Sequence, residues 1–157
     1  MRLGKNSMVI IQKEKIKKNL YKRVCNLDDV NEKLNKSILI SYDFWSQNKK
    51  ILSNKKIKIG VEVNSNQPFN EFEKDLGCFS LIQFHFETFK DGRPFSYAKK
   101  LRGLLKFKNE IRASGHILPD QYIFLIRCGF DSVEIKEKDK NIWLKLLKMD
   151  KGLYYQP

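Results

Sequence analysis

Four residues in the second half of the chain have side chains suited to holding an oxyanion. They are Arg93, Ser96, Arg112 and His116. A guanidinium group binds an oxyanion through two parallel hydrogen bonds, and hydroxyl and imidazole groups add further donors. These residue types predict an anion-binding site. No complete nucleophile–base set and no metal-ligand spacing is visible, so we assign no catalytic residue and expect no metal.

Five nearby residues are expected to support this site. They are Asp91, Gly92, His85, Asp120 and Glu134. Gly92 permits a tight turn before a helix that begins near Pro94, and such helix starts attract anions through their unpaired N–H groups. The site is therefore expected where strands end and helices begin.

Each of these residues also has a plainer structural interpretation. Asp91 and Asp120 are suited to capping the helices that they precede. Arg112 and Glu134 fall on neighbouring predicted strands with the same polarity, which suits a structural ion pair. His85 fits a partly buried histidine whose hydrogen bonds are satisfied. The sequence leaves these alternatives open.

The segments that carry these residues alternate between strand and helix patterns. Strands are predicted over 57–63, 79–86, 110–114 and 132–135. Helices are predicted over 68–76, 95–106, 119–128 and 138–149. A strand over 38–41, a helix over 43–52 and a short strand over 8–12 precede them. Such alternation is typical of an α/β protein with a mostly parallel sheet and right-handed crossovers.

Each predicted strand has one apolar and one polar face. Ile82 and Phe84, for example, alternate with Gln83 and His85. A sheet covered by helices on both faces contains nearly continuous apolar strands instead. The pattern therefore predicts helices mainly on one side of a barrel-like or half-barrel sheet, with functional groups at the C-terminal ends of the strands. A flavodoxin-like open sheet is the alternative.

Length and hydropathy favour a single α/β domain over residues 1–157, with a basic and less regular part at 1–37 and a core at 38–157. No run of 18 apolar residues occurs, and the apolar run near Met8 is too short for a secretory signal. We therefore expect a cytoplasmic protein that does not enter a membrane.

The net charge of +13 is concentrated in the first part of the chain. Residues 1–60 contain 15 basic and 5 acidic residues, and 25 of the 31 basic residues of the chain are Lys. No nucleic-acid motif and no cluster of stacking aromatics accompanies them, so nucleic-acid binding is not favoured. A solvated lysine-rich surface is the simpler interpretation.

The three cysteines do not form a redox or metal motif. No two of the cysteines, at positions 25, 78 and 128, form a C-x-x-C pair. The apolar neighbours of Cys78 and Cys128 predict that both are buried as small hydrophobic side chains. The chain also lacks a G-x-G-x-x-G fingerprint for a dinucleotide. The cofactor stays unknown, and flavin binding stays open.

Three stretches together resemble one bacterial family. Residues 89–102 resemble its "F-x-D-G-R-G-[FY]-S-x-A-x-x-L-R" motif, residues 110–121 its "E-L-R-A-x-G-x-V-L-x-D-Q" motif, and residues 127–131 its "R-x-G-F-D" motif. The family is DUF934, whose members are often labelled as oxidoreductases of sulfite reduction. The resemblance extends from about residue 38 to the end. Pro94 replaces the usual Gly of the motif, and His116 stands where Asp is common.

The resemblance implies a role in assimilating sulfate and sulfite for cysteine biosynthesis, because genes of this family typically lie beside those of the sulfate-reducing enzymes. Two functions follow as expectations. One is an accessory protein that acts with sulfite reductase or its electron donor, with the basic N-terminal half docking on an acidic carrier. The other is a small enzyme that acts on an anionic sulfur metabolite at an Arg- and His-lined rim. Whether the protein is an enzyme stays undecided.

Overall fold

The computed structural model describes residues 7–31 and 33–154. Within these residues, eight strands form one sheet in the order β2-β1-β8-β7-β6-β5-β4-β3. Their bounds are β1 (Met8–Gln12), β2 (Lys15–Lys17), β3 (Lys22–Arg23), β4 (Ser37–Ser41), β5 (Lys58–Asn64), β6 (Phe79–Phe86), β7 (Glu110–Gly115) and β8 (Ser132–Lys136). Strands β3 to β8 are parallel, and β1 pairs antiparallel with both β8 and β2.

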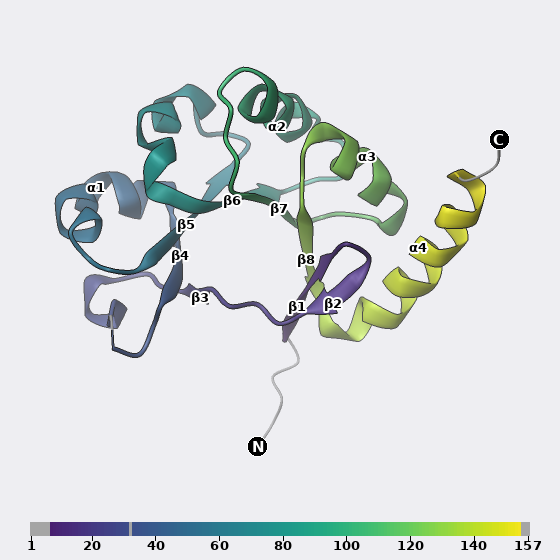
Figure 1. Cartoon of the computed structure of the whole chain (residues 1–157), viewed down its shortest axis with the longest axis horizontal. Helices are drawn as coiled ribbons and strands as arrows, with labels where there is room; N and C mark the ends of the chain where they lie inside the picture. Colours follow the sequence, from purple (N-terminus) through teal and green to yellow (C-terminus); the bar gives the residue numbers. More distant parts are fainter. Residues whose placement is uncertain (1–6, 32, 155–157) are drawn as a thin grey trace.

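The sheet curls, and its helices lie around the outside of the curl (Figure 1). Their bounds are α1 (Tyr42–Ser53), η2 (Phe69–Cys78), α2 (Arg93–Gly103), α3 (Tyr122–Cys128) and α4 (Lys140–Tyr154), with short 3-10 turns η1 (Leu27–Asp29), η3 (Pro119–Gln121) and η4 (Glu137–Asp139). The half-barrel prediction is confirmed. The predicted helix over 68–76 is a ten-residue 3-10 helix, and the one over 119–128 divides into η3 and α3.

Local signals place several of these boundaries. The Ser41 hydroxyl accepts the Phe44 N–H, so the last residue of β4 also caps α1. Gly129 ends α3 in the left-handed conformation, with a φ of 113°, which a residue with a Cβ rarely adopts. The chain can therefore turn directly from α3 into β8.

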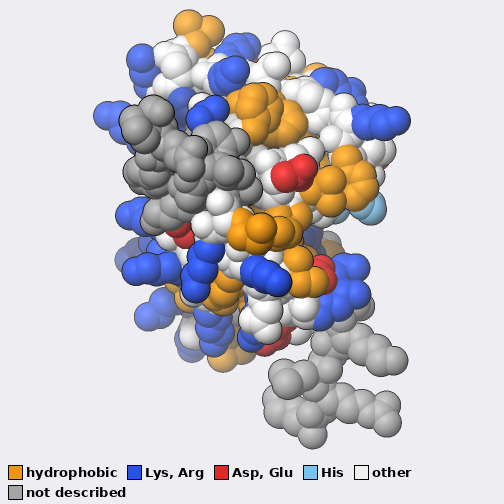
Figure 2. Space-filling model, turned by 90° about the vertical axis from the view of Figure 1, so that its right-hand side faces the viewer, with side chains coloured by type: hydrophobic (Ala, Val, Ile, Leu, Met, Phe, Trp, Pro, Cys, Tyr) orange, Lys and Arg blue, Asp and Glu red, His pale blue; other side chains and the backbone are white. Residues whose placement is uncertain are grey.

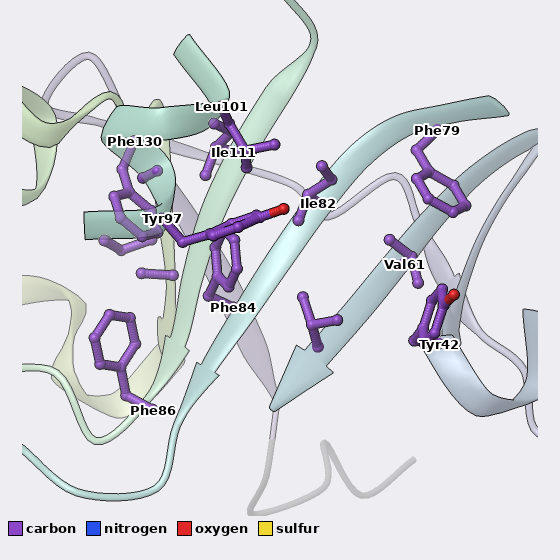
Figure 3. Close-up of a cluster of buried hydrophobic side chains, with 14 of the residues drawn as sticks. Tyr42, Val61, Phe79, Ile82, Phe84, Phe86, Tyr97, Leu101, Ile111 and Phe130 are labelled. Carbon is purple, nitrogen blue, oxygen red and sulfur yellow. The ribbon is translucent and has the colours of Figure 1, made fainter. Parts of the chain in front are cut away.

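The outer face of the sheet packs against the helices as an aromatic core (Figure 3). Phe84 is fully buried, and its ring centroid lies 5.6 Å from Phe69, 6.2 Å from Tyr97 and 5.8 Å from Phe130. All three pairs meet edge to face, which is a favourable arrangement for aromatic rings. This packing fixes η2, α2 and the turn after α3 against β6.

The inner face of the sheet is polar and is covered by residues 18–21, which we name the strap. The strap connects β2 to β3 and runs across the open side of the curl (Figure 1). The Tyr21 hydroxyl lies 2.7 Å from Ser80 Oγ on β6, and the Asn19 side chain bonds to residues of β7 and β8. Because of the strap, the half-barrel encloses its inner side chains.

No helix in residues 7–31 and 33–154 has both the length and the apolar character that a membrane crossing requires.

Candidate functional site

Arg112 lies inside the half-barrel, where it holds the inner face together. Its side chain is 4% exposed and donates a hydrogen bond of 3.0 Å to the Glu110 carboxylate. Longer hydrogen bonds connect it to Ser132, Asn19 and Gln83. The guanidinium also stacks on the Tyr21 ring at 5.6 Å. Since each of its three guanidinium nitrogens donates to a neighbouring side chain, Arg112 serves as a structural centre. Its ion pair is with Glu110 rather than with Glu134.

A cavity of about 600 Å³ opens at the C-terminal ends of the parallel strands. We name it the rim pocket. Its polar lining comprises Arg23, Glu62, His85, His116, Glu134, Lys136 and Asp139, and its apolar lining includes Met8, Phe89, Leu118 and Trp143. Three of the predicted residues, His85, His116 and Glu134, therefore do lie together. The position is the one expected for a binding site in a (β/α) fold.

An ion pair forms one wall of the rim pocket. Arg23 donates two hydrogen bonds to the Glu62 carboxylate, at 2.8 and 3.0 Å, and Gln83 adds a third at 2.7 Å. Burial raises the pKa of Glu62, but these hydrogen bonds and the Arg23 charge outweigh it and hold the pKa below its ordinary value. Glu62 is therefore a stable anion that fixes Arg23.

Glu134 behaves in the opposite way, although it lies on the same face. It is 8% exposed, and burial raises its pKa. The charges of Arg23 and Arg112 oppose that shift only in part, while Glu62 adds to it. Asn19 of the strap donates a hydrogen bond of 3.3 Å to Glu134. The rim pocket thus contains one firmly ionised carboxylate and one carboxyl group that retains its proton more readily.

Two histidines lie at the end of the neighbouring strands. Ser114 Oγ lies 3.2 Å from His85 Nδ1, so Nε2 is the ring nitrogen left for a ligand. Gly115 has a φ of 87°, and a Cβ there would lie 2.9 Å from His85 Cε1. The His116 ring packs edge-on against Phe89 at 5.4 Å. Together with Glu134, these rings can bind a small polar ligand and exchange protons with it.

Arg93 and Ser96 lie elsewhere, at the start of α2. They line a separate open cavity of about 880 Å³, which we name the helix-start cavity. Arg93 forms a double hydrogen bond with Asp91, and that pairing, ahead of the opposing effect of burial, lowers the pKa of Asp91 to about 2. The four residues expected to share one anion site are therefore distributed over three places. Asp120 is exposed in η3, outside both cavities.

Sequence reasoning missed Arg23 and Glu62. Glu62 belongs to the polar face that the alternation predicts, and that pattern could have included it in the site. Arg23 comes from the two-residue strand β3, whose only sequence signal is its Lys-rich surroundings. Pairing of β3 with β4 brings Arg23 to the rim, and such long-range pairing has no local signature.

Residues 7–31 and 33–154 contain no cluster of side chains suited to binding a metal ion, and their cysteines are free. No group of three His, Cys, Asp or Glu side chains there is placed to hold a metal ion. Cys128 is buried as predicted, but the prediction for Cys78 is wrong, because this residue ends η2 and is exposed. Its apolar neighbour Phe79 turns into the core, while Cys78 does not.

A family model with the description "Bacterial protein of unknown function (DUF934)" matches residues 60–157, more than half of the chain. The matched region begins within β5 and includes β6 to β8, α2 and α3. No curated protein and no solved structure matches the chain.

Proposed function

The chain belongs to DUF934, a bacterial family of unknown function, and from this premise we propose that it is a cytoplasmic accessory protein of assimilatory sulfite reduction. In this role it binds sulfite in the rim pocket and passes it to sulfite reductase for cysteine biosynthesis. The pathway comes from the motif resemblance. The site comes from the rim pocket, where groups from β3, β5, β6 and β8 converge.

The lining of the rim pocket supports a small oxyanion that also accepts protons. Lys136 supplies a positive charge, while Arg23 and Glu62 neutralise each other and Asp139 adds a carboxylate to the lining. Burial raises the pKa of Glu134, and in its protonated form this carboxyl group can donate a hydrogen bond where the ionised form would repel the anion. Imidazole N–H groups of His85 and His116 add donors of the same kind.

The face that carries α3 and α4 supports docking of a protein beside the pocket. Figure 2 shows apolar side chains there among lysines. Phe124 is 50% exposed and Ile142 is 59% exposed, and both lie on these helices. Trp143, on the same helix α4, lines the rim pocket. Exposed lysines such as Lys145 favour an acidic partner, as either the reductase or its electron donor could be.

The test is a calorimetric titration of the isolated protein with sulfite at constant ionic strength. We expect saturable binding that weakens about ten-fold in His116→Ala, a change of about 1.4 kcal/mol. His116 is exposed, so this variant should keep its fold. Asp120→Asn, which lies outside the pocket, is the control and should bind sulfite normally. Absence of saturable binding by the native protein would contradict the proposal.

A second candidate function is catalysis on an anionic sulfur metabolite in the same pocket, favoured by Glu134, whose pKa is raised by burial and which shares the lining with His85. Isolation of the tagged protein from its native cell at low salt separates the two. Sulfite reductase or its donor in the eluate, lost in Lys145→Glu, supports the accessory role. Turnover by the isolated protein, lost in Glu134→Gln, supports the enzyme.

A further inference from the structure

We propose that the N-terminal ends of the parallel strands form a face that binds the surface of an anionic lipid membrane. The connections that lead into β3, β4, β5 and β7 all end at this side of the sheet, because these strands are parallel. The rim pocket opens at the opposite ends of the same strands. We name the side that carries these connections the basal face, and its binding role does not depend on the function proposed for the rim pocket.

Three leucines of the basal face are exposed to an unusual degree. Leu20, Leu34 and Leu104 are 76%, 78% and 71% exposed, more than any other large hydrophobic side chain of the described residues. Each lies in a connection that leads into a parallel strand, Leu20 before β3, Leu34 before β4 and Leu104 before β7. A single exposed leucine is ordinary on a protein surface. Three such leucines at one end of a sheet indicate a face that inserts apolar side chains into another medium.

Exposed lysines accompany these leucines. They are Lys33, Lys36, Lys56, Lys58, Lys106 and Lys108. None of their ammonium groups forms an ion pair with a carboxylate of residues 7–31 or 33–154. The Lys58 N–H donates a hydrogen bond of 2.9 Å to the Lys36 carbonyl, so the connections into β4 and β5 present their lysines side by side. A solvated surface would explain the lysines alone, but not the exposed leucines among them.

Few carboxylates at this side oppose the lysines. Glu110, at the start of β7, and Asp131, directly before β8, each pair with an arginine. Asp28 and Asp29 of η1 are exposed in the connection into β4. Six lysines without an ion pair outweigh these two aspartates, so the basal face is positively charged.

A lipid surface fits this combination better than a protein or a nucleic acid does. Protein interfaces are depleted in lysine, and a central cluster of aromatic and arginine side chains supplies most of their binding energy. The leucines of the basal face are instead spread between the connections into β3 and β7, which are separated by three strands in the sheet. Single-stranded nucleic acids require aromatic side chains for stacking, a role that leucine does not fill. An anionic membrane attracts lysines over a wide area and accepts apolar side chains between its head groups.

The test is co-sedimentation of the full chain with unilamellar vesicles at constant ionic strength. We expect the protein to bind vesicles made of equal parts of phosphatidylglycerol and phosphatidylcholine, and to bind pure phosphatidylcholine at least about ten-fold more weakly. Leu104→Asn keeps the charge but removes an apolar side chain, so it should weaken binding to the anionic vesicles about ten-fold. Ile142→Asn is the matched control, because Ile142 is an exposed aliphatic residue of α4, and it should change binding less than about two-fold.

Lys56→Gln tests the electrostatic contribution. It should weaken binding to the anionic vesicles about five-fold, because a lysine close to an anionic membrane is attracted by its surface potential. Lys145→Gln, which removes an exposed lysine of α4, should change binding less than about two-fold. All four substituted side chains are exposed, and an unchanged Tm verifies that each variant keeps its fold.

Polyglutamate and a single-stranded oligonucleotide serve as competitors that carry negative charge without an apolar interior. A specific loss of vesicle binding in Leu104→Asn supports the proposal, since neither competitor offers a place for a leucine side chain. The proposal is overturned if the native protein does not bind the anionic vesicles, or if Leu104→Asn and Ile142→Asn weaken binding equally. It is also overturned if either competitor binds more tightly than the vesicles at the same concentration of negative charge.

Discussion

The two faces of β6 bury neighbouring side chains by different physical means. Phe84 and Gln83 are both fully buried. Phe84 faces the helices and contacts aromatic rings, and its burial is favourable in any orientation that fills the space. Gln83 faces the strap, where it bonds to Glu62 and Arg112. The outer face therefore contributes most of the stability. The inner face fixes the relative positions of the strands and the strap, because each of its polar groups requires a particular hydrogen-bond partner.

The largest effect is expected on the outer face. Phe84→Ala removes a ring at the centre of the aromatic core and leaves a cavity, so it should lower the free energy of unfolding by about 3–5 kcal/mol. Phe124→Ala is the matched control, because this ring is 50% exposed, and it should cost less than about 1.5 kcal/mol. Urea denaturation measures both. Equal losses would show that the outer face is not the main source of stability.

An intermediate effect is expected on the inner face. Arg112→Met leaves Glu110 without its ion pair and removes the contacts to Asn19 and Gln83, which should cost about 2–4 kcal/mol because Glu110 is partly exposed. The strap should also loosen locally, and faster amide exchange at Tyr21 measures this directly. The control Lys99→Met replaces an exposed cation on α2. An unchanged rate of amide exchange in the strap would show that the polar contacts of the inner face do not hold the strap in place.

The same contrast explains how much of the fold could be predicted from sequence. Alternation of apolar and polar residues depends only on the two-residue period of a strand, so it located both faces of β5 to β8 and the half-barrel. It could not reveal whether the polar face is open. The strap that encloses Arg112 is held in place by the hydrogen bond from Arg112 to Asn19 and by the pairing of the following strand β3 with β4. Neither contact has a local sequence pattern.

The candidate site was predicted only in part for a similar reason. His85 and His116 lie at the ends of the parallel strands β6 and β7, Glu134 lies in the neighbouring β8, and the topology brings them to one rim. Arg93 lies in the segment after β6, and its distance from a strand end in sequence suggested the same rim. However, α2 begins at Arg93 itself and packs on the outer layer against η2, so this side chain faces away from the rim pocket. The direction in which a chain leaves a strand depends on packing, which residue types do not specify.

The smallest effect concerns the pH dependence of Glu134. Burial raises its pKa in the folded protein, so the folded state holds this proton more tightly than the unfolded state. Its contribution to stability is complete below the ordinary carboxyl pKa and is lost as the pH rises through the raised value. Glu134→Gln cannot ionise, so relative to the native protein it should gain stability between pH 4 and pH 7, by about 1 kcal/mol or less. Urea unfolding across this range measures the gain.

Glu137 provides a control of opposite sign. The Ser7 hydroxyl donates to it at 2.7 Å, and this bond, followed by the charge of Lys140, lowers its pKa. Its contribution is present above the ordinary carboxyl pKa and is lost as the pH falls through the lowered one, so Glu137→Gln should lose stability relative to the native protein as the pH rises. If both variants changed in the same direction, burial on the inner face would not be what distinguishes Glu134. Opposite slopes would show that the half-barrel interior controls the protonation of its carboxyl group, which the rim pocket needs if Glu134 is to donate a hydrogen bond.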